Sequence, residues 1–194
     1  MATKQKTGSS NGTENSGTLK LMGVAALGVA AGLAANFGRK LMVQAPSMAA
    51  GSWREALATE HRMVLKLFDA LEATDASQTA RRTMLLAQIK HALGKHAFQE
   101  ENVIYPALRD HGEAEKAEHL IVDHGDVKHF LFELETMAND APGFLPTVRS
   151  LRTNLETHMR EEEDEIFPAF DAKLTEKERT KLTLSMNKEG LKLA

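Results

Sequence analysis

An internal repeat constrains the fold of this 194-residue chain more than any other feature of its sequence. The twelve residues from His96 read HAFQEENVIYPA, and the twelve from His158 read HMREEEDEIFPA. An acidic residue followed by a histidine precedes each copy, and these histidines are His61 and His124. The two histidines are 35 positions apart in the first half and 34 in the second. Such self-similarity indicates a duplicated supersecondary unit, so the chain is expected to fold as two copies of one hairpin.

Apolar residues recur at steps of three and four along four segments, which is the period of an amphipathic α-helix. A capping box, Ser52 with Glu55, marks the beginning of the first helix. Turn residues at 110–112 and 139–143 separate the later helices. The apolar stripes run from Leu57 to Leu71, from Ile89 to Ala107, from Ala117 to Ala138 and from Val148 to Ile166. Four such helices with short connections predict an all-α, up-down four-helix bundle.

Two prolines and a second capping box predict where the later helices end. Pro106 should bend or end the last turn of the second helix, because proline has no amide hydrogen to donate. The fourth helix should end near Pro168 for the same reason. Thr175 with Glu178 forms the other capping box, which predicts a short accessory helix near residues 175–185.

Composition excludes several classes of protein. The chain has no cysteine, so it holds no disulfide, thiolate metal site or cysteine nucleophile. Its 24 Lys and Arg against 27 Asp and Glu leave a formal net charge of -3. That balance provides no global positive field, so we expect no nucleic acid partner. The lack of cysteine fits a reducing compartment, and a cytoplasmic domain of bacterial type, with or without a membrane tether, is the expected location.

The first fifty residues differ in composition from the rest. Residues 1–18 are polar and are predicted to form a disordered tail, because they offer little apolar surface to bury. Residues 21–38 carry no charge and approach the length that crosses a bilayer, but their many Gly and Ala residues weaken the insertion signal. A membrane tether, a signal peptide, and a helix lying on the bundle or at an oligomer contact all remain open. The predicted domains are the tail (1–18), an apolar helix and linker with Pro46 in its spacer (19–50), the bundle (51–172) and an accessory helix with its tail (173–194).

Six polar side chains fall on the apolar stripes, at positions that face the bundle axis. They are His61, His96, Glu100, His124, His158 and Glu162. Burying an unpartnered imidazole costs roughly 1–3 kcal/mol, and an isolated carboxylate costs far more. Ion pairs among the six alone would leave a large desolvation penalty with no gain in packing. A pair of metal ions would satisfy the lone pairs of every group.

The spacing within each repeat fits this chemistry. A histidine and a glutamate four residues apart lie on the same side of a helix, so they can reach one ion or two ions that share the carboxylate. Imidazole and carboxylate ligands suit iron, manganese or zinc, and no thiolate favours a softer metal. The residues therefore predict a two-metal site and leave the metal open.

From residue 53 to residue 171 the chain resembles the hemerythrin-like domains, also called HHE cation-binding domains. The doubled H-x-x-x-E-E motif and the aromatic-proline step after it carry the resemblance. It implies a non-haem di-iron centre, with the four histidines as terminal ligands and Glu100 and Glu162 as bridges. Two iron ions become the expected cofactor, ahead of manganese or zinc. The implied function is binding of a small ligand (oxygen, nitric oxide or peroxide) for sensing, storage or redox chemistry.

Two departures from the oxygen-carrying hemerythrins favour another branch of that family. Those proteins have two histidines four apart on the third helix, whereas here Lys128 stands four residues after His124. Their fourth helix has an aspartate five residues after its histidine, where this chain has Glu162 at four and Glu163 at five. A peroxide-consuming or oxidase enzyme at the same centre and a metal-free interaction module remain as alternatives, and the electron donor is not identified.

Other polar and aromatic residues have plainer expected roles. Glu101 and Glu163 follow the bridging positions by one residue, which turns them about 100° off the axis. We expect them in solvent or against a ligand histidine, although either could lend an oxygen to a metal. Four histidines are not expected to bind the metal pair: His91, His111, His119 and His129. The aromatic residues Trp53, Phe68, Phe98, Tyr105, Phe130 and Phe167 should pack in the core, with the Tyr105 phenol also able to donate a hydrogen bond to a bound ligand.

Overall fold

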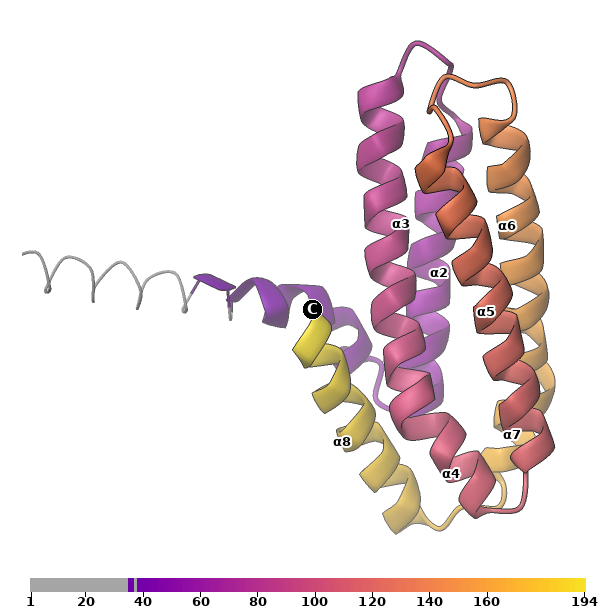
Figure 1. The fold of residues 1–194 in the computed structure, drawn as a ribbon. Coiled ribbons are helices and arrows are strands. Elements are labelled where there is room, and N and C mark those ends of the chain that lie inside the picture. Colours follow the sequence, from indigo (N-terminus) through magenta and orange to yellow (C-terminus); the bar gives the residue numbers. More distant parts are fainter. Residues whose placement is uncertain (1–34, 37) are drawn as a thin grey trace, which may run out of the picture. The chain divides into compact units, whose positions relative to one another are not determined.

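The structure is a computed structural model that describes residues 35, 36 and 38–194. From residue 40 onward the chain forms one compact unit, and all of its regular elements are helical. The elements are α2 (Trp53–Glu72), α3 (Thr79–Gln99), η1 (Glu100–Ile104), α4 (Tyr105–Asp110), α5 (Ala114–Thr136), α6 (Phe144–Arg160), η2 (Glu161–Ile166), α7 (Phe167–Asp171) and α8 (Glu176–Leu193). Helices α2, α3, α5 and α6 lie side by side in Figure 1 and form the predicted four-helix bundle.

Local sequence signals explain where these helices begin. The predicted capping box is present before α2: the Ser52 hydroxyl accepts from the amide of Glu55, and the Glu55 carboxylate accepts from the amide of Ser52. The second capping box is also present at Thr175, where α8 begins. This accessory helix reaches Leu193 instead of ending near residue 185, because its inner face packs against the bundle. Tertiary packing therefore extends a helix that local signals predicted to be short.

Pro106 was expected to bend or end the last turn of the second helix, and the structure shows that the helix does not end there. The fourth helix, expected to end near Pro168, ends at Asp171. A π-helical segment precedes each proline, η1 before Pro106 and η2 before Pro168, and an α-helix then continues to Asp110 and Asp171 respectively. The amide of Tyr105 donates to the carbonyl of Glu100, five residues back. The equivalent Phe167 amide donates to the carbonyl of Glu162. The wider turn gives the proline ring room, so the helix bulges instead of stopping.

The predicted spacer around Pro46 is helical, which corrects the expectation of a linker there. Residues 40–49 form a helical segment that packs against α8 and the bundle. The Lys40 ammonium donates to the carbonyl of Leu191 at 3.1 Å, and the Gln44 amide donates to Asn187 Oδ1 at 3.1 Å. Gly190 allows this approach, since a Cβ there would lie 2.6 Å from Gln44 Oε1.

Predictions for the first residues of the chain stay predictions. The disordered tail (1–18) and nearly all of the uncharged segment (21–38) fall outside the residues that the structure describes. Within the described part of the chain, no helix combines the length and apolarity needed to cross a membrane.

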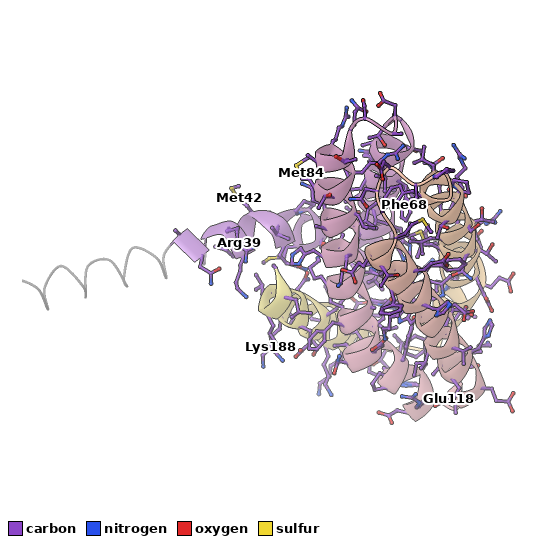
Figure 2. The ribbon with its side chains drawn as sticks, turned by 45° about the horizontal axis from the view of Figure 1, so that its top comes forward. Arg39, Met42, Phe68, Met84, Glu118 and Lys188 are labelled. Carbon is purple, nitrogen blue, oxygen red and sulfur yellow. The ribbon has the colours of Figure 1, made fainter. Side chains whose placement is uncertain are left out.

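Two apolar clusters fill the bundle, one towards each end. The first includes Val64, Phe68 and Leu155, and the second includes Trp53 and Leu57. Figure 2 shows Phe68 within the bundle and Met84 and Glu118 on its outside. The six polar residues predicted to face the axis lie between the two clusters, as His61 does between Leu57 and Val64 on α2. They therefore form a polar layer inside an otherwise apolar core.

Candidate metal centre

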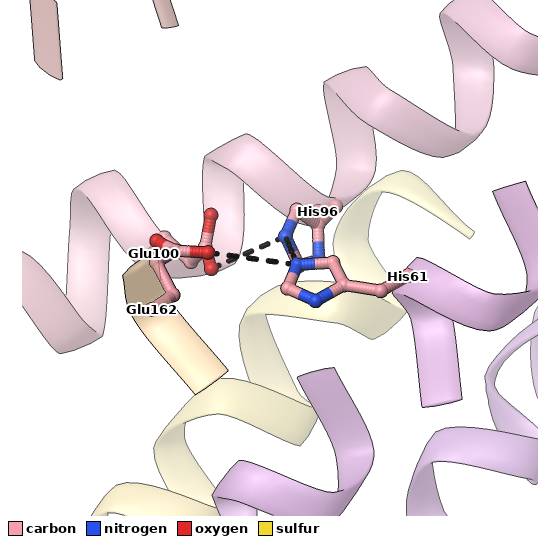
Figure 3. A group of neighbouring side chains, drawn as sticks. All are labelled: His61, His96, Glu100 and Glu162. Atoms are coloured by element: carbon pink, nitrogen blue, oxygen red, sulfur yellow. Dashed lines mark hydrogen bonds and ion pairs between the residues drawn. The ribbon is translucent and has the colours of Figure 1, made fainter. Parts of the chain in front are cut away.

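All six predicted ligand residues converge in the core. Their exposed fractions are 2% for His61, 5% for His96, 0% for Glu100, 4% for His124, 3% for His158 and 0% for Glu162. The histidines come from α2, α3, α5 and α6, and the glutamates come from the two π-helical segments. Figure 3 shows His61, His96, Glu100 and Glu162 pointing toward one another. The prediction that these side chains face one another is confirmed.

Both glutamates lie between the two hairpins. Glu100 Oε1 is 3.1 Å from His96 Nε2, and its Oε2 is 3.3 Å from His124 Nε2. Glu162 Oε2 is 3.5 Å from His61 Nε2 and 3.4 Å from His158 Nε2. Each carboxylate therefore faces one histidine from each hairpin, Glu100 through its two oxygens and Glu162 through Oε2 alone.

Each of the four histidines turns its Nε2 inward and its Nδ1 toward a carboxylate. The Nδ1 atoms of His61 and His124 lie 2.6 Å and 3.0 Å from Glu163 Oε1 and Glu101 Oε1. Those of His96 and His158 lie 3.3 Å from Glu60 Oε2 and Asp123 Oδ2. A carboxylate can only accept here, so it favours a proton on Nδ1 and leaves the Nε2 lone pair pointing inward. This carboxylate–histidine pairing is the one that metal-binding histidines use.

Sequence reasoning missed two of these carboxylates, Glu60 and Asp123. Glu101 and Glu163 were expected either in solvent or against a ligand histidine, and the structure places them against histidines. Glu60 and Asp123 were given no role, although each stands directly before a repeated histidine. The signal was present as an acidic residue at the same place in both halves. The sequence did not show what these acidic residues contact, because the histidine that each one faces lies on the neighbouring helix.

Burial and neighbouring charges push the pKa values of the central groups apart. Burial, together with the charge of Glu100, raises the pKa of Glu162 well above its usual range. Burial would also raise the pKa of Glu100, but the charge of His96 and a hydrogen bond with His124 hold it well below its usual range. Burial would lower the pKa of His96, yet Glu100 raises it to about 10. Without a bound cation, these side chains therefore cannot all keep the protonation states that they have in water. A bound cation would offset the negative charge of the two carboxylates.

The donor atoms fit bound cations. Among the described residues, Glu100 Oε1, Glu162 Oε2 and His158 Nε2 are buried without a hydrogen-bond partner. His61 Nε2 and His96 Nε2 are only 2.8 Å apart, a distance at which two lone pairs require a proton or a metal ion between them. Ligand atoms within 4.8 Å of one another form two groups that share Glu100: His61, His96, Glu100 and Glu162; and Glu100, His124 and His158. Two overlapping sets of nitrogen and oxygen donors can hold two neighbouring ions.

The two halves of the centre differ in what surrounds the ligands. In the first half, the Lys95 ammonium donates to Glu60 Oε1 at 2.6 Å and to Gln44 Oε1 at 2.8 Å. The Ser47 hydroxyl also donates to Glu60 Oε1, at 2.5 Å. Hydrogen bonding to His96 and the charges of His96 and Lys95 overcome burial and lower the pKa of Glu60 to about 2. A buried ion pair between Lys95 and Glu60 therefore lies against the His96 imidazole.

Tyr105 contributes a phenol to the centre, where the second repeat has Phe167. Its hydroxyl donates to Glu162 Oε1 at 2.8 Å and lies 3.1 Å from His124 Nε2. Burial and the charges of Glu100 and Glu162 raise the pKa of Tyr105 well above its usual range. The phenol therefore keeps its proton and can donate to an oxygen atom within the centre.

An apolar cavity of about 180 Å³ reaches the centre from one side. Apolar side chains of α3, α5 and α6 form most of its wall, and His96, His124 and His158 lie at its inner end. Lys90 and Lys128 line it as well. Three of the four histidines of the centre therefore line a mostly apolar cavity.

Comparison with known proteins agrees with this geometry. Residues 54–170 match the hemerythrin HHE cation-binding domain family. An uncharacterised hemerythrin-like protein from Schizosaccharomyces pombe is 27% identical over 140 residues, which are 69% of this chain and 66% of that protein. A DNA nickase from Nostoc is 30% identical over 118 residues, 60% of this chain but only 33% of the nickase.

A solved structure shares the fold. The crystal structure of a hemerythrin HHE cation-binding domain-containing protein from Mycobacterium kansasii matches with a TM-score of 0.66 at 24% identity. The match covers 73% of this chain and 86% of that one. Since the family match spans residues 54–170, more than half of the chain, this protein belongs to the hemerythrin family of HHE cation-binding domains and is a metal-binding protein.

Proposed function

We propose that this protein holds a non-haem di-iron centre and uses it to bind a small ligand such as oxygen, nitric oxide or peroxide. The observation that carries the proposal is the position of Glu100 and Glu162. Each glutamate faces one histidine of the first hairpin and one histidine of the second. The four histidines would be terminal ligands, and the two glutamates would bridge the ions. The nicking activity of the Nostoc relative is not part of the proposal, because the match spans a third of that protein.

Iron is favoured over other metals by family membership combined with the donor set. Imidazole and carboxylate donors suit iron, manganese and zinc alike, and the chain has no cysteine to favour a softer ion. The pair of ions would supply Lewis acidity and electrons to a ligand. The protein would supply a dry core around the ions, fixed histidine tautomers, and the Tyr105 phenol as a proton donor.

The apolar cavity supports a small ligand in particular. Its walls include Leu93, Val127 and Leu155, which offer no hydrogen bonds to a larger polar substrate. A diatomic molecule or peroxide fits within about 180 Å³ and could reach the histidines from this side. Sensing, storage and redox chemistry all begin with such a binding step.

Metal analysis with optical spectroscopy tests the proposal. Purified full-length protein is expected to contain close to two iron ions per chain, and exposure of the reduced form to oxygen should produce new charge-transfer absorption. Nitric oxide added to the reduced protein should give a different spectrum. Protein that holds no stoichiometric metal would contradict the proposal and would favour the metal-free interaction module.

Consumption of peroxide at the same centre is a second candidate, and Tyr105 is the observation that favours it. A Tyr105→Phe variant should keep its iron, because the phenol is not among the predicted ligands and the second repeat already has Phe167 at this position. Its affinity for a ligand that accepts the phenol hydrogen bond, or its rate of peroxide turnover, should fall roughly 10- to 100-fold. Iron content, ligand titration and peroxide loss would be measured on both proteins. An unchanged response to ligand and peroxide would remove the role assigned to this phenol.

A further inference from the structure

A second group of metal-binding side chains lies on the surface beside the core centre. His119 and Asp123 lie four residues apart on α5, and Glu161 begins η2. His119 Nε2 is 3.1 Å from Glu161 Oε2 and 3.7 Å from Asp123 Oδ2. One ligand atom from each residue lies within 4.8 Å of the other two. The three side chains can therefore contact one ion.

The internal repeat offers a direct comparison for this cluster. Asp123 is the counterpart of Glu60, because each precedes the first histidine of its half. Glu60 holds a cation, the Lys95 ammonium, at 2.6 Å. The residue equivalent to Lys95 in the second half is Thr157, and no lysine or arginine of the described chain forms an ion pair with Asp123. The second half thus keeps the carboxylate but lacks the lysine, and the imidazole of His119 lies beside Asp123 in its place.

The second half has two further metal-binding side chains near Asp123 where the first half has the Lys95 ammonium near Glu60. By the alignment of the repeats, His119 stands where the first half has Ala56, and Glu161 stands where it has Gln99. Ala56 cannot bind a metal, and the Gln99 amide is a weaker and uncharged ligand. An imidazole and a second carboxylate therefore join the Asp123 carboxylate only in the half that has no lysine. The two carboxylates together carry a negative charge that favours a divalent cation.

The surroundings leave this face accessible to ions from solvent. In the first half, residues 40–49 and α8 cover the equivalent face, and Ser47 and Gln44 bond to Glu60 and Lys95. In the second half, a groove of about 730 Å³ includes His119, Asp123 and Glu161. Asn154 also lines it, and the Oδ1 atom of this residue is buried with no hydrogen-bond partner among the described residues. The groove has room for the water molecules that would complete the coordination of an ion.

We propose that His119, Asp123 and Glu161 form a second, solvent-exchangeable site for a divalent first-row cation. One imidazole and two carboxylates suit Zn²⁺, Fe²⁺ or Mn²⁺, with water filling the remaining positions. Asp123 also accepts from His158 Nδ1, so the outer site adjoins the core centre through a shared carboxylate. The outer site does not depend on which metal the core centre binds.

Zn²⁺ binding to full-length protein tests the site. Total bound metal per chain would be measured by equilibrium dialysis against Zn²⁺ and elemental analysis for the wild type, Glu161→Gln and His119→Ala. Two matched controls, Glu118→Gln and His129→Ala, change exposed residues on the same helix. The imidazole NMR signals of His119, assigned from its variant, would be followed in the same titration.

The wild type and both controls should bind one more ion than Glu161→Gln and His119→Ala, or bind that ion at least about tenfold more tightly. The His119 signals should shift as this ion binds. Because the comparison is a difference between proteins, a core that holds fewer ions than proposed would lower all counts together and leave the difference intact. Equal counts and affinities in all five proteins would overturn the outer site. An equal loss in the control variants would also overturn it, since it would indicate diffuse attraction to an acidic surface.

Discussion

A Glu162→Gln variant is expected to lose at least one of two bound iron ions while its metal-free form stays as stable as the metal-free wild type. Glutamine keeps the shape of the side chain but cannot bridge two cations as an anion. Burial raises the pKa of Glu162, so the charged form of this carboxyl is disfavoured in the metal-free protein. Removing its charge therefore changes little until metal is added.

The loss should appear in the stability of the loaded protein. At a free metal concentration about a thousand times Kd, one bound ion adds roughly 4 kcal/mol to the free energy of unfolding. In a protein of this size that corresponds to a Tm lower by roughly 8–16 °C in the loaded variant. Iron content and thermal unfolding with and without iron would be measured on the wild type, the variant and a Glu165→Gln control in the exposed part of η2. A variant that retains two ions, or a metal-free Tm that falls as far as the loaded one, would exclude a bridging role.

A Lys95→Met variant is expected to lower the free energy of unfolding by about 3–5 kcal/mol, because it removes the ammonium ion that pairs with the buried Glu60 carboxylate. The two side chains are 6% and 7% exposed, so water cannot replace the missing ammonium. Ser47 and His96 would remain as hydrogen-bond partners, but the His96 imidazole lies 3.3 Å from Glu60 Oε2, farther than the 2.6 Å between the ammonium and Glu60 Oε1. Chemical denaturation of the metal-free proteins would measure the change.

Two further variants separate the ion pair from simple packing. Adding Glu60→Gln to Lys95→Met should recover part of the loss, because no buried charge is then left unpaired. Lys90→Met removes a lysine that is 53% exposed and should change stability by less than about 1 kcal/mol. A double variant that is no more stable than Lys95→Met alone would show that the lysine acts through packing.

The ion pair also predicts a dependence of stability on pH. The pKa of Glu60 falls from 4.5 to about 2 in the folded protein. A carboxyl whose pKa is lower in the folded state stabilises the fold above its unfolded pKa and loses that contribution as the pH falls. His96 and Lys95 share in this lowering of the pKa, so the excess stability of the wild type over Lys95→Met should be present near neutral pH and should shrink as the pH falls through 4.5 towards 2.

Sequence pattern predicted which six polar side chains meet in the core because the repeat and the helical period act together. His96 and Glu100 share a helix face at a spacing of four, and His158 and Glu162 repeat it. At Pro106 the same reasoning left open whether the helix bends or ends, and the structure shows a π-helical turn that accommodates the ring without ending the helix. The sequence also left open whether Glu101 and Glu163 lie in solvent or against a histidine, since this depends on how the neighbouring helix packs.

The sequence by itself determined which side chains face the bundle axis, since the direction of a side chain on a helix follows from its position within 3.6 residues per turn. Only the tertiary structure decided how the two halves differ. Residues 40–49 and α8 cover the face of the bundle beside Glu60, where Lys95 forms an ion pair with Glu60 and donates to Gln44. The equivalent face beside Asp123 is an open groove. Contacts between segments far apart in the chain depend on how helices pack, and no local spacing specifies that packing.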